Sequence, residues 1–374
     1  YETGFDYELS ILGYYNNYPD TYKVINRLMN YNNQSYDNHL SNYKFYCPKL
    51  SNQNYLIKTI GGIEIKENMN IFGTNYEMNA SNPCIFKIRN LDTNLHLKKS
   101  NYKYMINIRF VNYTLNKNGT YNFGVNDGKI VTVNKIFELN EDLNIKDNTI
   151  MLIPNNNNLQ YIGIEDIKPY DIPYNEENTV QNNEDNTVQH NEDTTFLLKK
   201  ENINTNKHII PFIGTCQNPI NNKLTIGYGE ININNINNIN NINNINNNIS
   251  YNPVNTLYNK NCEKNWVFYG DYKIIYQWYP LILGTIIKKN NENNQSELFF
   301  EKEKEIKMPY FFQQVRGSTN GCHFGDEIWF ICHVVEYSQP REYYHFFSVF
   351  NKQDMNIKKW SNLFKYEGEK IEYS

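Results

Sequence analysis

Residues 316–336 read RGSTNGCHFGDEIWFICHVVE. A polar cluster opens this stretch, a Gly-Asp turn follows, and the run 328–335 then brings β-branched and aromatic residues together. Such runs, bounded by Gly, Asn and Asp, are typical of β-strands. Similar runs occur at 104–111, 274–279 and 345–350. Because long series of strands without alternating helices indicate an all-β fold, we expect a mainly β structure over residues 51–374.

One unit recurs along this region, and in each copy a short polar cluster precedes a strand. The clusters begin at residues 81, 163, 262 and 316, and a fifth starts near Gly368. Intervals of roughly 50 to 100 residues, the longer ones containing insertions, agree with the blade period of a β-propeller. We therefore predict a five-bladed β-propeller whose last blade is incomplete.

Two low-complexity segments interrupt the repeat, at about 174–207 and 230–252. The first contains the near copies ENTVQ and DNTVQ, and the second repeats Ile-Asn-Asn. Both are predicted to be solvated loop insertions, because the entropy of loop closure grows only with the logarithm of loop length. An aggregation-prone polar ladder is the alternative for the Ile-Asn-Asn repeat.

The first 50 residues follow a different pattern. Leu9, Leu12 and Tyr15 have helical spacing, and Pro19 suits the first turn of a second helix. These residues predict a short α-helical hairpin that looks like the end of a tetratricopeptide-type array, whose repeats need neighbours to bury their faces. The chain also starts without Met and ends abruptly at Ser374, so we expect a fragment of a longer protein.

Composition argues against several classes of protein. A formal net charge of −4 and a pI near 6 give no basic surface for nucleic acid. No apolar run approaches the roughly 20 residues that span a bilayer, and no signal peptide is seen. We therefore predict an intracellular protein, in the cytoplasm of a host cell or of an AT-rich protist. The abundance of Asn, the 32 Tyr residues and the single Ala, Ala80, indicate an AT-rich genome.

Six cysteines are present, and their spacing predicts no metal site. None lies in a C-x-x-C pair, and none has the spacing of zinc ligands. We interpret them as reduced, buried thiols. No metal and no cofactor is predicted.

The propeller geometry gives the polar clusters a common place. The first strand of each blade lines the central channel, so the residues that open these strands converge at one mouth of it. A concave site with acidic, basic, amide and aromatic groups suits a carbohydrate or glycan, with phosphate as a further candidate ligand. The predicted substrate-binding residues are Asn82, Arg109, Glu165, Lys264, Asn265, Trp266, Arg316 and His333.

Asp166 and Glu263 are the candidate catalytic carboxylates, because glycoside hydrolysis uses two of them across the scissile bond. Asp166 as general acid requires a raised pKa. Glu165 and Asp166 are neighbours on an expected strand, so only one of them should face the channel. An ion pair with Lys264 is the alternative for Glu263.

Several of the other candidates also have a structural alternative. Trp266 could belong to a buried aromatic core, and His333 could serve packing instead of acid–base chemistry. For Arg316 the sequence leaves open whether it meets a ligand, a carboxylate or a backbone carbonyl.

The polar clusters resemble those of the five-bladed propellers of glycoside hydrolases and mannoside phosphorylases. The runs 164–167, 263–268 and 316–336 are closer still to large proteins of giant viruses and bacteria. In those proteins a glycosyltransferase domain precedes tetratricopeptide-like helices and such a propeller. The resemblance covers most of the chain apart from the insertions.

This resemblance implies that Asp166 acts as general acid and that Arg, Lys and His side chains hold phosphate. Lys168 stands where the phosphorylases have Arg, and Lys lacks the bidentate fork of that residue, which disfavours phosphorolysis. The sequence therefore favours a carbohydrate-binding propeller module that serves glycan synthesis or modification with an upstream glycosyltransferase. The alternative is an active glycoside hydrolase or phosphorylase. A protein-interaction propeller is less favoured, because the channel mouth is polar and charged.

Overall fold

The computed structural model describes part of the chain, and this part is almost all β. The described residues are 66–89, 102–116, 120–123, 128–140, 142–153, 159–170, 195–197, 209–232, 247–248, 250–256, 258, 260–290, 296–336, 342–361 and 363. They contain no α-helix and one 3-10 helix, η4 (Tyr310–Gln314). The predicted helical hairpin at residues 1–50 and the fifth cluster near Gly368 lie outside these residues.

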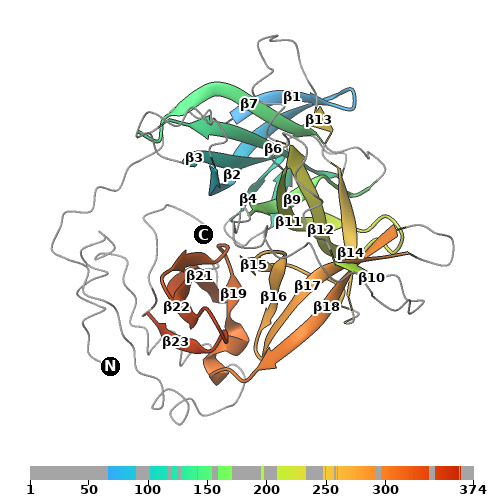
Figure 1. Cartoon of the computed structure of the whole chain (residues 1–374). Helices are drawn as coiled ribbons and strands as arrows, with labels where there is room; N and C mark the ends of the chain where they lie inside the picture. The colour runs from blue at the N-terminus through green and yellow to red at the C-terminus, as the bar shows by residue number, and fades with distance from the viewer. Residues whose placement is uncertain are drawn as a thin grey trace, which may run out of the picture.

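Most strands belong to four antiparallel meanders of four strands each (Figure 1). The first consists of β2 (Thr74–Arg89), β3 (Tyr102–Val111), β6 (Ile130–Leu139) and β7 (Ile145–Ile153). The second consists of β9 (Ile164–Pro169), β11 (Ile209–Gln217), β12 (Leu224–Asn232) and β14 (Tyr251–Asn255). The third consists of β15 (Val267–Gly270), β16 (Lys273–Trp278), β17 (Leu281–Asn290) and β18 (Ser296–Ile306). The fourth consists of β19 (Arg316–Gly317), β21 (Glu327–Glu336), β22 (Glu342–Asn351) and β23 (Ile357–Trp360).

Shorter strands extend these meanders or stand beside them. They are β1 (Lys66–Ile71), β4 (Tyr113–Leu115), β5 (Tyr121–Phe123), β8 (Tyr161–Ile162), β10 (Thr195–Leu197), β13 (Asn247–Asn248) and β20 (Cys322–Phe324). β10 and β13 come from the low-complexity segments and pair with β17 and β7. β4 and β5 pair only with each other among the described strands.

The prediction of a five-bladed propeller is wrong, whereas the predicted α-helical hairpin falls outside the described residues. The described strands form sheets of seven, nine, five and two strands instead of separate four-stranded blades, and no α-helix is described. β14 and β18 pair in parallel, with Val254 opposite Leu298, and this joins the second and third meanders into the nine-stranded sheet. The physical reason is that the outer edge of a meander exposes unpaired backbone groups, which a neighbouring edge can pair.

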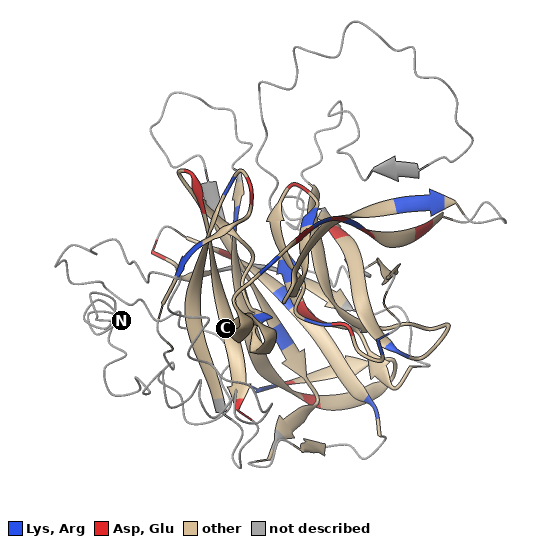
Figure 2. Cartoon of the chain, turned by 90° about the horizontal axis from the view of Figure 1, so that it is seen from below, with Lys and Arg blue, Asp and Glu red and all other residues tan. Residues whose placement is uncertain are grey.

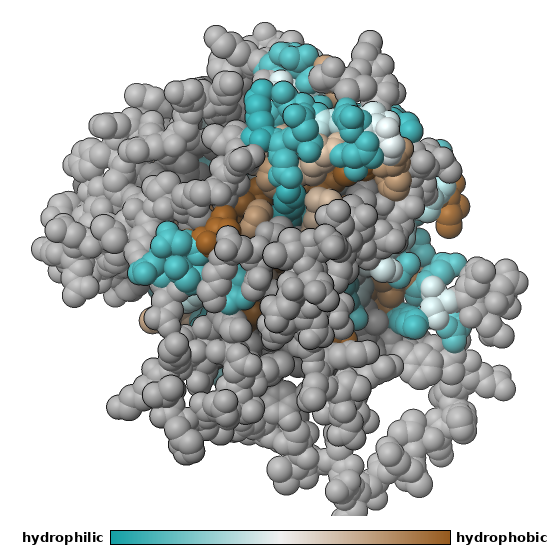
Figure 3. Space-filling model, turned by 90° about the horizontal axis from the view of Figure 1, so that it is seen from above, coloured by the Kyte–Doolittle hydropathy of each residue, from teal (hydrophilic) through white to brown (hydrophobic). Residues whose placement is uncertain are grey.

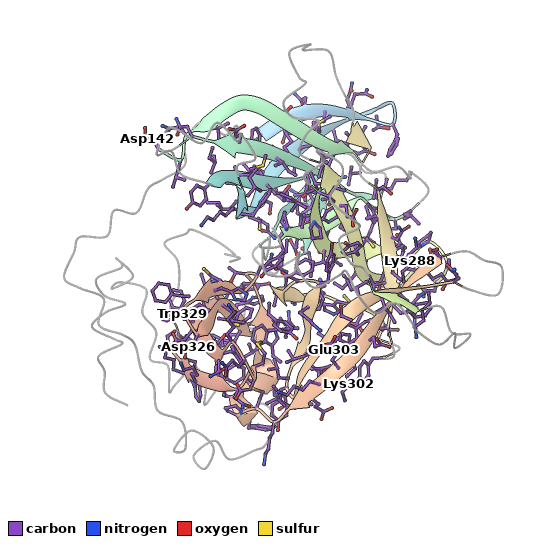
Figure 4. The ribbon with its side chains drawn as sticks, viewed as in Figure 1. Asp142, Lys288, Lys302, Glu303, Asp326 and Trp329 are labelled. Carbon is purple, nitrogen blue, oxygen red and sulfur yellow. The ribbon has the colours of Figure 1, made fainter. Side chains whose placement is uncertain are left out.

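The hydrophobic core lies between successive meanders. Phe86 of β2 packs in one cluster with Phe212 of β11, and Trp266 packs in another with Tyr228 of β12. A third cluster contains Trp278 together with residues of the fourth meander. Strands buried on both faces read as nearly continuous apolar runs, which explains why β17 begins Leu-Ile-Leu-Gly-Thr-Ile-Ile. Side chains fill the space between the sheets (Figure 4), whereas Glu303 of β18 is exposed.

The first strands of the meanders lie near one another. β9 contacts β2, β3 and β6, and β16 contacts β19. The side chain of Asn320 joins three meanders, because Nδ2 donates to the carbonyl of Pro169 at 2.8 Å and Oδ1 accepts from the backbone N–H of Phe268 at 3.0 Å. Seen from below, charged residues lie in the middle of the molecule as well as around its rim (Figure 2). Described residues of both hydrophilic and hydrophobic type are visible on the face seen from above (Figure 3).

Candidate functional site

Asn82 and Asp166 lie in β-bulges of neighbouring strands. β2 shifts its register against β3 between Ser81 and Cys84, and β9 shifts against β11 around Asp166. Asn82 has a φ of 38° and Asp166 a φ of 53°, in the left-handed region that Asn and Asp tolerate better than most residues. Bulges re-aim side chains, and here Asn82 Nδ2 donates a hydrogen bond to Asp166 Oδ1 at 2.7 Å.

Arg109 of β3 is the cation that holds this pair. Arg109 is buried, with 5% of its surface exposed. Nη1 donates to Asp166 Oδ1 at 2.6 Å, Nη2 lies 3.6 Å from Glu165 Oε1, and Nη2 also donates to the hydroxyl of Tyr113. Both carboxylates of β9 therefore reach Arg109. The expectation that only one of them faces the site is wrong, because the left-handed backbone at Asp166 breaks the alternation of a regular strand.

Asp166 is a carboxylate at neutral pH. Burial raises the pKa of Asp166, but the charges of Arg109 and Lys168 and the hydrogen bonds from Asn82 and Arg109 together lower it to about 2. Its side chain is 35% exposed. Both hydrogen bonds end on Oδ1, and no described residue donates to Oδ2.

Lys168 brings a second positive charge to the site from the same strand. Burial lowers the pKa of Lys168, and the charge of Asp166 raises it. Within the part of the chain that the structure describes, its ammonium makes no ion pair with a carboxylate. The nearby thiol of Cys84 stays protonated, because burial raises its pKa to about 11. We call Asn82, Arg109, Glu165, Asp166 and Lys168 the Asp166 cluster.

Arg316 and His333 lie on the fourth meander, opposite each other in the register of β19 and β21. Burial, followed by the charges of His345, Arg316 and Lys168, lowers the pKa of His333 to about 3. The Nδ1 atom of His333 is 2.7 Å from Ser318 Oγ. His333 is therefore neutral at pH 7, and it shares an electrostatic environment with Lys168 and Asp166 of the cluster.

Lys264 and Asn265 precede β15 on the third meander. Lys264 is exposed, and its charge acts on the phenol of Tyr121, as does that of Glu165. Asn265 has a φ of 63°, so the left-handed conformation of Asn82 and Asp166 occurs in a third meander too. Its carbonyl lies where a Cβ on Gly317 would approach to 2.9 Å, which explains the glycine at that position.

Glu263 and Trp266 make their contacts with residues outside the Asp166 cluster. Glu263 is 5% exposed; Tyr276 donates to its Oε1 at 2.5 Å, and Lys260 Nζ is 3.9 Å from its Oε2. Trp266 is 1% exposed, and its ring packs on those of Tyr276 and Phe300 at centroid distances of 4.9 and 5.2 Å. Among the described residues, no hydrogen bond or ion pair joins Glu263 to Asp166.

The sequence reasoning missed Tyr113 and Ser318 as parts of this environment. Tyr113 directly follows the strand that carries Arg109, and it is 8% exposed. The sequence shows Tyr113 next to Asn112, but with 32 Tyr residues in the chain this position did not single it out. Ser318 belongs to the quoted polar cluster, and only the fold shows that its hydroxyl meets His333.

The cluster offers carboxylates, an amide and cations within one neighbourhood, which allows hydrogen bonds to hydroxyl groups and charge contacts to anions. Over the described ranges, no group of three or more His, Cys, Asp and Glu is placed to hold a metal ion. No helix in the same ranges has the length and apolarity that crossing a membrane requires.

Comparisons with known proteins find distant likenesses in structure only. No family model and no curated protein matches the chain. A mannose phosphorylase from Leishmania mexicana, in complex with phosphate ion, is 10% identical, with a TM-score of 0.34 over 76% of this chain and 68% of that one. A β-1,2-mannobiose phosphorylase from Listeria innocua, in complex with β-1,2-mannobiose, is 11% identical, with a TM-score of 0.38 over 82% and 78%. A glycoside hydrolase is 11% identical, with a TM-score of 0.29 and the same coverage.

Proposed function

We propose that the Asp166 cluster is a carbohydrate-binding site and that the chain is a carbohydrate-binding module. The observation that carries the proposal is the ionised, partly exposed carboxylate of Asp166, which Asn82 and Arg109 hold in place. Fixed polar groups of this kind orient a ligand because they lose little freedom when it binds.

The expected roles of the residues follow from their hydrogen-bonding groups. Asp166 Oδ2 accepts from a sugar hydroxyl, and Lys168 donates to another or meets a phosphate group. Arg109 positions Asp166, since its Nη1 atom is already used in that contact. Lys264, Asn265 and Arg316 extend the site from the third and fourth meanders.

Binding is favoured over catalysis by the ionisation of Asp166. A general acid must carry its proton near neutral pH, whereas the pKa of Asp166 is lowered to about 2. Glu263, the other candidate carboxylate, is buried and hydrogen-bonded by Tyr276. An active glycoside hydrolase or phosphorylase that uses Asp166 as general acid is therefore the less favoured alternative.

We further infer that the module serves glycan synthesis or modification beside a glycosyltransferase. This part of the proposal is supported by the sequence resemblance of the runs 164–167, 263–268 and 316–336.

The test is a sugar panel with a parallel assay for turnover. Mannosides, glucosides and related sugars are titrated calorimetrically into the wild-type chain and into Asp166→Asn, with and without inorganic phosphate. We expect saturable binding without sugar release, and affinity about tenfold lower in Asp166→Asn, because the variant loses a charge-assisted hydrogen bond. Turnover that disappears in Asp166→Asn would instead establish an enzyme. No binding of any sugar would refute the proposal.

A further inference from the structure

The β4–β5 hairpin stands apart from the three large sheets and is anchored at its base. It leaves β3 directly after Val111, and its register places Tyr113 opposite Phe123 and Leu115 opposite Tyr121. Asn112, which is 2% exposed, fixes the base: Nδ2 donates to the carbonyl of Lys129, and Oδ1 accepts from the N–H of Val131, both at 2.9 Å. The hairpin therefore has a defined position relative to β6.

A continuous set of contacts leads from this hairpin to the Asp166 cluster. The rings of Tyr121 and Tyr113 meet edge to face at a centroid distance of 4.5 Å. The hydroxyl of Tyr113 accepts a hydrogen bond from Arg109, and Arg109 in turn binds Asp166. Phe123, two residues further along β5, has its ring centroid 6.1 Å from that of Tyr121.

Tyr121 remains partly exposed to solvent at this end of the contacts. It is 45% exposed, whereas Tyr113 is 8% exposed. Burial raises the pKa of Tyr121, the charge of Glu165 raises it further, and the charge of Lys264 lowers it. The phenol thus lies near a carboxylate of the second meander and a cation of the third, at the edge of the polar cluster.

The two tryptophans of the third meander cannot take this role. Trp266 is 1% exposed and Trp278 is 4% exposed, and both pack inside aromatic clusters. Tyr104 is 40% exposed, but it lies toward the other end of β3, opposite Lys87 and Leu139. Among the described residues, Tyr121 therefore combines an open aromatic ring with the neighbourhood of the cluster.

We propose that Tyr121 is the aromatic platform of the carbohydrate site, and that it selects pyranosides that present an apolar C–H face beside their hydroxyl groups. This inference rests on the function proposed above. A tyrosine ring offers a large, rigid, amphipathic surface at low cost in conformational entropy. The sugar's C–H face lies on the ring while its hydroxyls meet Asp166 and Lys168.

The test compares three variants of the whole chain with the wild type, using the best-binding sugar of the panel. We expect Tyr121→Ala to lower the affinity about tenfold and Tyr121→Phe to stay near the wild type, because stacking needs the ring and not the hydroxyl. Tyr104→Ala, which replaces a comparably exposed tyrosine on β3, should leave the affinity unchanged. Wild-type affinity in Tyr121→Ala would overturn the inference, and so would an equal loss in Tyr121→Phe.

A fourth variant guards against a disturbed hairpin. Tyr121→Trp keeps an aromatic ring and adds a fluorescent indole, whose emission should change on sugar addition with the half-saturation measured by calorimetry. The wild-type titration gives the background from the native tryptophans. Unchanged emission at saturating sugar would contradict the platform. If the wild type binds no sugar at all, the proposed function fails too; if it binds and only the Tyr121 results fail, the binding site stands without this platform.

Discussion

Asp166 and Glu263 hold comparable places in neighbouring meanders, yet their surroundings differ. The side chain of Asp166 is 35% exposed, and its partners Asn82 and Arg109 come from another meander. The side chain of Glu263 is 6% exposed, and its partners Tyr276 and Lys260 lie close to it in the chain. The comparison teaches that contacts across meanders, and not the position within the repeat, turn a carboxylate toward a shared polar site.

Replacing Arg109 should have the largest effect on stability and should abolish the difference between the two sites. In Arg109→Met, Asp166 and Glu165 lose their buried cation, and the hydroxyl of Tyr113 loses a donor. We expect the free energy of unfolding to fall by about 3 kcal/mol, because breaking one side of a buried charge pair leaves the other uncompensated. Chemical denaturation measures this loss, and sugar binding should vanish with it. A loss below about 1 kcal/mol would show that the cluster does not depend on Arg109.

Acid should lower the free energy of unfolding through His333, which lies near the cluster. The folded pKa of His333 is about 3, against an ordinary value of 6.5. Below pH 6.5 the unfolded chain binds a proton that the folded chain does not, so stability is intact at higher pH and falls as the pH drops. This residue should account for about 2 kcal/mol lost between pH 8 and pH 5. Denaturation curves of His333→Gln should show a correspondingly shallower pH dependence; an identical dependence would argue against the buried neutral imidazole.

The two carboxylates should differ in function more than in stability. Asp166→Asn weakens a partly screened pair, so we expect a loss of about 1 kcal/mol at neutral pH. Because the pKa of Asp166 is lowered to about 2, this contribution is present above pH 4 and lost as the pH falls toward 2. Glu263→Gln should also cost about 1 kcal/mol, through its hydrogen bond from Tyr276. A much larger loss in either variant, measured by denaturation at pH 7, would show that the two sites are not energetically comparable.

A surface ion pair gives the smallest expected effect and a baseline for the others. Lys273 Nζ lies 2.5 Å from Glu303, and their side chains are 41% and 33% exposed. Lys273→Ala should change the free energy of unfolding by less than about 0.5 kcal/mol, because water and salt screen such pairs. The same denaturation assay checks this. A change as large as that of Arg109→Met would remove the distinction between buried and exposed pairs.

Much of the strand content could be predicted from sequence, but the grouping of strands could not. The runs 328–335 and 104–111 fall within β21 and β3, and the run 274–279 coincides with β16 up to Trp278, because β-branched and aromatic residues between turns have few other stable arrangements. The parallel pairing of β14 with β18 depends on which edges meet in space, and no local pattern encodes it. This pairing is where the structure departs from the predicted set of separate blades.

The polar residues of the candidate site are visible in the sequence, whereas the directions in which their side chains point are not. Asn82 and Asp166 were predicted as polar residues that open strands, but both lie inside strands, β2 and β9, at bulges that are not visible in the sequence. A shift of one residue turns a strand side chain to the other face, so the environments of Glu263 and Trp266 could not be read from their spacing. Tyr121 could be identified as a candidate only from the fold, because its link to the cluster is the contact between its ring and that of Tyr113.

Sugar affinity of Asp166→Asn beside Glu263→Gln tests the central claim most directly. Both variants replace one carboxylate by its amide, so they differ only in place. With the best-binding sugar, calorimetry at pH 7 should give an affinity about tenfold below the wild type for Asp166→Asn and a wild-type affinity for Glu263→Gln. Equal affinities in the wild type and Asp166→Asn, or a loss confined to Glu263→Gln, would contradict a carbohydrate site at the Asp166 cluster.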